Sequence, residues 1–107
     1  MKGPTERTLA ELRRQGYRAD VVEKWIPQAR RRKDLFDIID IVAIGNGETI
    51  GVQCTSASNV ASRVTKIEES DAVRDLRESG WRLLVIGWRS KMVGKQKRWV
   101  YREVDVS

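Results

Sequence analysis

Two apolar β-type runs joined by a glycine-rich turn constrain the fold of this chain more than any other feature. Residues 35–44 are rich in Ile and Val, and a second run covers residues 49–55. The turn between them, Gly45-Asn46-Gly47-Glu48, contains an Asn-Gly pair that accepts the positive φ angles of a tight hairpin. The runs are therefore predicted to be neighbouring antiparallel strands. Asp40 and Gln53 interrupt them, and a sheet core excludes a carboxylate unless it is paired or binds a metal.

Helical periodicity is found before and after this hairpin. Residues 5–15 are predicted to form a helix closed by Gly16, with Thr8 and Glu11 fitting a capping box, and residues 56–70 and 71–79 to form further helices. The other segments are read as a short β piece at 20–26, a basic loop at 28–33, a strand at 81–88, a basic turn at 90–96 and a last strand at 97–106.

The resulting order, α-β-β-β-α-β-β, predicts an α/β fold with a mixed central β-sheet flanked by helices. The connection from the third strand through the helices to the fourth is long enough for a parallel crossover. At 107 residues, the chain is expected to form one domain, residues 1–107.

Composition excludes several functional classes. The chain has no histidine, which removes Ser-His-Asp catalysis, and Cys54 is its single cysteine, which removes a disulfide or a cysteine-based zinc cluster. No apolar run approaches the roughly 20 residues of a membrane span, and no export signal is evident, so a cytoplasmic protein is expected.

Strand alternation suggests that the polar residues converge. Asp40 is expected to share a face with Phe36, Ile38, Val42 and Ile44, and Gln53 to share one with Thr55. Both are displaced away from the hairpin turn, so Asp40 and Gln53 can meet at one end of the strand pair.

The carboxylate of Asp40, the amide oxygen of Gln53 and the carbonyl of Cys54 would suit Mg²⁺, which prefers oxygen ligands. Lys66 follows on the next helix as a candidate to stabilise charge on a phosphate. Arg63 precedes it by three residues and so shares its helix face.

The charge balance favours nucleic acid as a partner. The 21 Lys and Arg exceed the 15 Asp and Glu, giving +6 at pH 7. The candidate phosphate contacts lie in two basic segments and on the second helix: Arg30, Arg31, Arg32 and Lys33; Arg89, Lys91, Lys95, Lys97 and Arg98; and Arg63.

Structural roles compete with each of these interpretations. Asp40 could cap a strand end or pair with Arg31 or Arg32, and Gln53 could satisfy neighbouring backbone groups. Glu11 could serve only in the capping box, and Lys66 and Arg63 could form a solvated helix face. Asp34 is assigned to the loop and Asp37 to the solvated side of the strand. Glu23 is interpreted as an ordinary charge at a strand edge, with a further site acid as the alternative. The basic segments could be solvated hairpin tips.

The segments KDLFDIIDIVAI, GVQCTS and SNVASRVTKI, in this order after a first helix, resemble the PD-(D/E)XK nuclease superfamily. The likeness extends over about residues 5–90 and is strongest to phage and bacterial proteins related to Holliday-junction resolvases and VRR-type nucleases. It implies a restriction-endonuclease-like core in which Asp40 is the motif aspartate, and Gln53 and Thr55 stand where an acid and a lysine are usual. It further implies that Lys66 replaces that lysine and that Glu11 is an additional ligand.

The resemblance implies a metal-dependent DNA endonuclease with Mg²⁺ or Mn²⁺ held by Asp40, Gln53 and Glu11, with Lys66 completing the catalytic set. Branched DNA is an expected substrate and a homodimer the expected assembly. The alternatives are an inactive nuclease fold that binds DNA, and an interaction module that assembles through its last strand.

Overall fold

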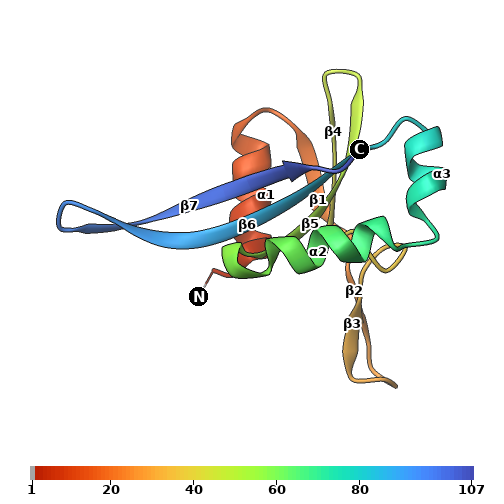
Figure 1. Cartoon of the computed structure of the whole chain (residues 1–107), viewed down its shortest axis with the longest axis horizontal. Coiled ribbons are helices and arrows are strands. Elements are labelled where there is room, and N and C mark those ends of the chain that lie inside the picture. Colours follow the sequence, from red (N-terminus) through yellow and green to blue (C-terminus); the bar gives the residue numbers. More distant parts are fainter. Residues whose placement is uncertain (1) are drawn as a thin grey trace.

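The computed structural model describes residues 2–107 and contains a five-stranded mixed sheet with helices on both faces (Figure 1). Along the chain the elements are α1 (Pro4–Arg14), β1 (Arg18–Val21), β2 (Lys24–Ile26), β3 (Arg31–Lys33), β4 (Ile41–Gly45), β5 (Glu48–Ser56), the 3₁₀ turn η1 (Ala57–Asn59), α2 (Val60–Glu68), α3 (Val73–Glu78), β6 (Arg82–Val93) and β7 (Gln96–Asp105). The sheet order is β1-β4-β5-β6-β7, and β2 and β3 form a separate pair. The prediction of an α/β fold with a mixed sheet flanked by helices is confirmed. No helix within residues 2–107 is long and apolar enough to span a bilayer.

The β4–β5 hairpin forms as predicted. Gly45 pairs with Glu48, and the two loop residues, Asn46 and Gly47, have φ angles of 53° and 76°. Positive φ at both positions matches a type I′ turn, whose twist suits the flanking strands. The predicted parallel crossover is also present, because β5 runs parallel to β6 while the other neighbouring strands in the sheet are antiparallel.

The first half of the predicted strand at residues 35–44 is instead a tight turn, and that part of the prediction was wrong. Leu35 and Ile39 exchange backbone hydrogen bonds, with Phe36 and Asp37 at positive φ between them. The simple alternation assumed from Phe36 to Ile44 therefore fails. Asp40 consequently lies at the entrance to β4, directly after the turn.

The central strand β5 is buried on both faces, which explains its nearly continuous apolar sequence. Ile50, Val52 and Cys54 belong to the core cluster that includes Leu12 of α1. The opposite face is covered by α2 and α3, whose apolar residues cluster with Leu83 and Val85 of β6. Each fully buried Ile or Leu stabilises the fold by about 1.5–3 kcal/mol. Gln53 lies between Val52 and Cys54 in β5, so its side chain points to the opposite face of the sheet, the one covered by α2.

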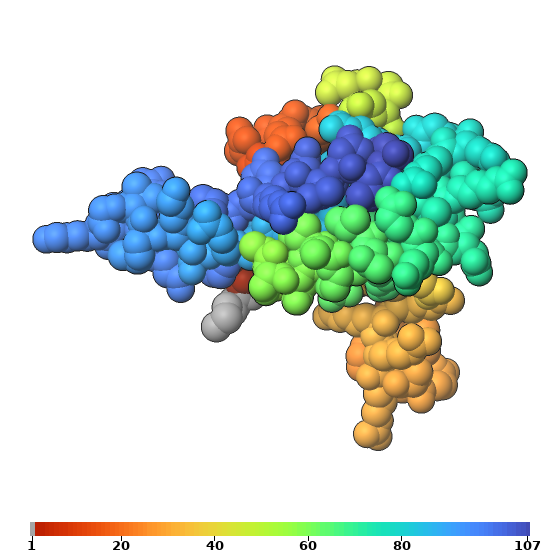
Figure 2. Space-filling view, in the orientation of Figure 1, coloured from red at the N-terminus to blue at the C-terminus, as the bar shows by residue number. Residues whose placement is uncertain are grey.

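Two β-hairpins project from this body. The β2–β3 hairpin extends on one side, and the outer parts of β6 and β7 form a long ribbon on another (Figure 1; orange and blue in Figure 2). The basic segments predicted as a loop at 28–33 and a turn at 90–96 are thus partly strands: β3 starts at Arg31, and the second turn is confined to Gly94 and Lys95. Cross-strand backbone pairing extends both segments despite their polar sequences.

The start of α1 corrects the predicted capping box at Thr8 and Glu11. Pro4 occupies the first turn, where its fixed φ suits a helix start. The Glu6 carboxylate accepts a hydrogen bond from the Gly3 N–H at 2.8 Å, so the cap lies one turn earlier. The Thr8 hydroxyl instead donates to the Pro4 carbonyl.

Candidate metal centre

Asp40 and Gln53 meet at the entrance to β4. Oδ2 of Asp40 accepts hydrogen bonds from Nε2 of Gln53 at 2.6 Å and from the backbone N–H of Cys54 at 2.8 Å. The Asp40 N–H in turn donates to the Val52 carbonyl at 2.8 Å, which fixes the residue against β5. Asp40 is 4% exposed and Gln53 is 2% exposed. A carboxylate and an amide are therefore buried together on the α2 face of the sheet.

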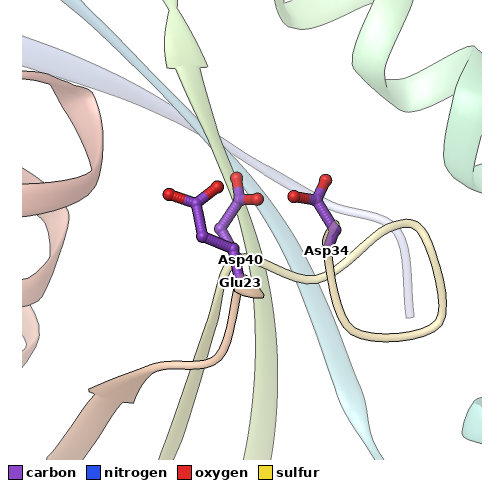
Figure 3. A group of neighbouring side chains, drawn as sticks. All are labelled: Glu23, Asp34 and Asp40. Atoms are coloured by element: carbon purple, nitrogen blue, oxygen red, sulfur yellow. The ribbon is translucent and has the colours of Figure 1, made fainter. Parts of the chain in front are cut away.

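Glu23 and Asp34 complete a group of three carboxylates with Asp40 (Figure 3). One oxygen from each lies within 4.8 Å of the others. Glu23 directly precedes β2 and Asp34 directly follows β3, so the two ends of the projecting hairpin bring them together. Their side chains are only 13% and 16% exposed. The sequence favours a strand edge for Glu23, with a site acid as the alternative, and a loop for Asp34. Recognising the β2–β3 hairpin would have placed them opposite each other.

Burial controls the protonation of Asp40. Removal from water raises the pKa of Asp40 to about 7, and a hydrogen bond and the negative charge of Asp34 act in the same direction, against the opposing effect of the Cys54 N–H. Three converging carboxylates repel one another in a site of low dielectric. A shared proton or a bound cation relieves that repulsion.

The amide of Gln53 supplies the second indication of a ligand. Its Oε1 is buried and has no hydrogen-bond partner among the described residues. A buried polar atom left unpaired costs about 1–3 kcal/mol. Its Nε2 points at Asp40 and also lies 3.4 Å from Oδ2 of Asp34. Reversing the amide would direct Oε1 toward both carboxylates, which is the orientation a shared cation requires.

The donor set fits a hard divalent cation. It consists of three carboxylates and one amide oxygen, and Mg²⁺, Mn²⁺ and Ca²⁺ all prefer oxygen ligands. Thiol or imidazole ligands are absent from the group, and the buried Cys54 belongs to the opposite core cluster.

Cations surround the entrance to the site. Nζ of Lys66, on α2, lies 3.6 Å from Oδ2 of Asp34, and the guanidinium of Arg32 lies 2.6 Å from Glu23. Arg63, one turn earlier on α2, is half-buried. A shallow pocket of about 370 Å³ opens here, lined by Arg31, Arg32, Lys33, Asp34, Asp37 and Lys66. Negative ligands with a rim of exposed cations suit a site that receives a phosphate group.

Glu11, the additional ligand implied by the resemblance, is not in this group. It lies on α1, where its carboxylate accepts hydrogen bonds from Arg14, Gln15 and the Tyr101 hydroxyl. The bond from Arg14 is the main reason that its pKa falls to about 2. These contacts account for Glu11 without a metal. The other basic residues singled out are exposed on the two hairpins: Arg30, Arg31 and Lys33 on one, and Arg89, Lys91, Lys95, Lys97 and Arg98 on the other.

No protein-family model, curated protein or solved structure matches this chain.

Proposed function

We propose that this chain is a divalent-metal-dependent DNA endonuclease of the PD-(D/E)XK type. The observation that carries the proposal is the convergence of Glu23, Asp34 and Asp40 beside the buried Gln53, whose Oε1 has no hydrogen-bond partner within residues 2–107. The order of the main-sheet elements supports it: a helix, three strands, a helical crossover and two further strands agree with a restriction-endonuclease-like core.

Each side chain has a distinct role in this proposal. Asp40 and the Gln53 oxygen hold Mg²⁺ or Mn²⁺ from the rigid sheet, and Glu23 and Asp34 close the site from the projecting hairpin. The bound ion would polarise a phosphodiester and lower the pKa of a water molecule. The ammonium group of Lys66 leaves its ion pair with Asp34, contacts the phosphate instead and stabilises the negative charge that develops there. Arg31 and Lys33 position the DNA backbone from the rim.

Cleavage assays test this function. Single-stranded, duplex and branched DNA are incubated with the protein in Mg²⁺, Mn²⁺ or EDTA. Cutting should require the cation and be lost in Asp40→Asn. Asp75→Asn is the matched control, because Asp75 is an exposed carboxylate on α3 that does not line the pocket at the metal centre. Cutting that persists in EDTA or in Asp40→Asn would refute the assignment.

The role of Gln53 has a separate test in Gln53→Glu. Adding a charged ligand should tighten Mn²⁺ binding at least tenfold by titration calorimetry, a gain of about 1.4 kcal/mol. In EDTA the same variant should be less stable than the wild type, because it places a fourth carboxylate beside Asp40 and removes a hydrogen-bond donor. Unchanged Mn²⁺ affinity would mean that Gln53 is only a structural partner of Asp40.

A second function, DNA binding without cleavage, is favoured by one observation. Gln53 and Thr55 are neutral at the positions where the resemblance expects an acid and a lysine. Under this alternative, DNA is retained at low salt, no product forms with either cation, and Asp40→Asn binds DNA as the wild type does.

The proposed endonuclease acts as a homodimer, which light scattering of the free and DNA-bound protein would test.

A further inference from the structure

The outer part of the β6–β7 hairpin carries the net charge of the molecule. This arm, residues 89–102, is exposed over nearly its whole length. It contains no acidic residue, and its cations are Arg89, Lys91, Lys95, Lys97, Arg98 and Arg102. These six equal the formal +6 of the chain, so the remaining residues are balanced in charge. Within residues 2–107, none of the arm's cations lies in an ion pair.

Cross-strand register places four of these six cations on one face. Lys91 stands directly opposite Arg98, and Arg102 lies opposite Gly87. Alternation places these residues and Arg89 on a single face of the ribbon, which continues the α2 face of the sheet on which Asp40 and Gln53 meet. The other face continues the α1 side and carries the aromatic residues and Lys97. Trp88 packs on Tyr101 there, and Arg7 and Lys97 lie over the Trp99 ring, 3.7 and 5.6 Å from its centroid.

The Lys91–Arg98 pair does not stabilise the free arm. Like charges directly opposite on antiparallel strands destabilise the pairing. No acidic residue of the arm offsets them. An anion that lies across both side chains would therefore lower the free energy of the ribbon.

We propose that the arm lies in the major groove of duplex DNA, with Arg89, Lys91, Arg98 and Arg102 against the phosphates. This inference rests on the proposed function for the identity of the partner. A two-stranded ribbon fits a major groove about 12 Å wide, whereas the deep, narrow groove of duplex RNA does not admit it. The five residues from Arg89 to Val93 span about 17 Å. The arm thus holds the duplex at a distance from the metal centre and on the same face of the sheet.

The test measures binding separately from cleavage. A fluorescent 20-base-pair DNA duplex is titrated in EDTA with the Asp40→Asn protein, with and without Lys91→Gln/Arg98→Gln. Removing two phosphate contacts should lower the affinity at least tenfold at 0.1 M salt and reduce the slope of log K against log salt by about 1.8. The melting temperature of the free protein should stay equal or rise, because the like-charge pair is removed. A melting temperature that falls together with the affinity would show a structural effect and overturn the inference.

Arg18→Gln/Arg74→Gln is the control, since it removes the same charge from β1 and α3. The inference is refuted if this control weakens binding as much as the arm variant does. It is also refuted if duplex RNA of the same sequence binds as tightly as DNA, or if the parent protein does not bind the duplex. A wild-type protein that binds DNA through the arm but cuts nothing would overturn the endonuclease and leave the arm assignment standing. A wild-type protein that cuts DNA, together with an arm variant that binds DNA as tightly as its parent, would support the endonuclease and overturn the arm assignment.

Discussion

Replacing Asp40 with asparagine is expected to stabilise the metal-free protein at pH 8, although it alters a buried, doubly hydrogen-bonded residue. The reason is the cost of charging Asp40 inside the sheet. Its pKa is raised from an ordinary value of 3.8 to about 7, mainly by burial. A shift of this size corresponds to about 4 kcal/mol of charging cost when the group is fully ionised.

Asp40→Asn avoids this charging cost, but it also weakens a hydrogen bond, which offsets part of the stabilisation. The Cys54 N–H would donate to a neutral amide oxygen in place of a carboxylate, which costs about 1 kcal/mol. Nε2 of Gln53 donates to the same oxygen as the Cys54 N–H, so the asparagine oxygen at that position keeps both hydrogen bonds. The net expectation is a gain of about 1–3 kcal/mol in the free energy of unfolding at pH 8.

The sign of the pH dependence follows from proton binding. Between about pH 4 and pH 7 the folded wild type holds a proton on Asp40 that the unfolded chain has released. This contribution to wild-type stability is fully present below pH 4 and is lost as the pH rises through 7, at up to about 1.4 kcal/mol per pH unit. The difference between Asp40→Asn and wild type should therefore grow from pH 5 to pH 8.

Urea unfolding in EDTA at pH 5, 6.5 and 8 measures this difference, with Asp75→Asn as the control for removing an exposed carboxylate. Adding Mn²⁺ at 100 times its Kd should stabilise the wild type by about 2.7 kcal/mol and leave Asp40→Asn unchanged. The reasoning is refuted if Asp40→Asn is less stable than the wild type by the same amount at all three pH values. That result would make Asp40 a structural hydrogen-bond acceptor without a charging cost.

Three further outcomes are expected. Lys66→Gln should lower the cleavage rate by about 10²–10³-fold, whereas Lys66→Arg should retain part of it; equal rates for the wild type and both variants would contradict a role at the phosphate. Gly87→Ala should destabilise the fold by about 1–3 kcal/mol in urea titrations, because its Cβ would lie 2.3 Å from Val60 Cγ2; a neutral result would mean that α2 can move away from the sheet. Trp88→Phe should cost at least about 1 kcal/mol through the lost 2.9 Å hydrogen bond from Nε1 to the Thr8 hydroxyl, and an unshifted melting temperature would show that this bond contributes nothing.

Local patterns in the sequence were enough to predict most of the main sheet. Asn46-Gly47 fixes a turn by its backbone preferences alone, and the helical periodicity after Ser56 fixes a crossover and hence a parallel strand pair. The meeting of Asp40 with Gln53 followed because both lie on short segments whose separation is set by that turn.

The other two carboxylates could not be predicted in the same way. Glu23 and Asp34 approach Asp40 only because the polar, basic segment between them folds back as a hairpin. The sequence predicts β structure up to residue 26, but residues 28–33 have no apolar alternation and no Asn-Gly turn, so local propensity favours a loop there instead of a returning strand. The tight turn at Phe36 and Asp37 was also hidden, because positive φ at such residues is uncommon.

The position of Glu23 and Asp34 at the two feet of the β2–β3 hairpin has a thermodynamic consequence. The hairpin bears exposed cations at its far end, while Asp40 and Gln53 belong to the rigid sheet. A polyanion that tilts the hairpin would therefore change the distances between the carboxylates. Conversely, an ion that binds Glu23 and Asp34 together with Asp40 would change the orientation of the hairpin relative to the sheet. Under the proposed function, binding of the metal ion and of DNA would be coupled, and linkage would require that each alter the affinity of the other by the same factor.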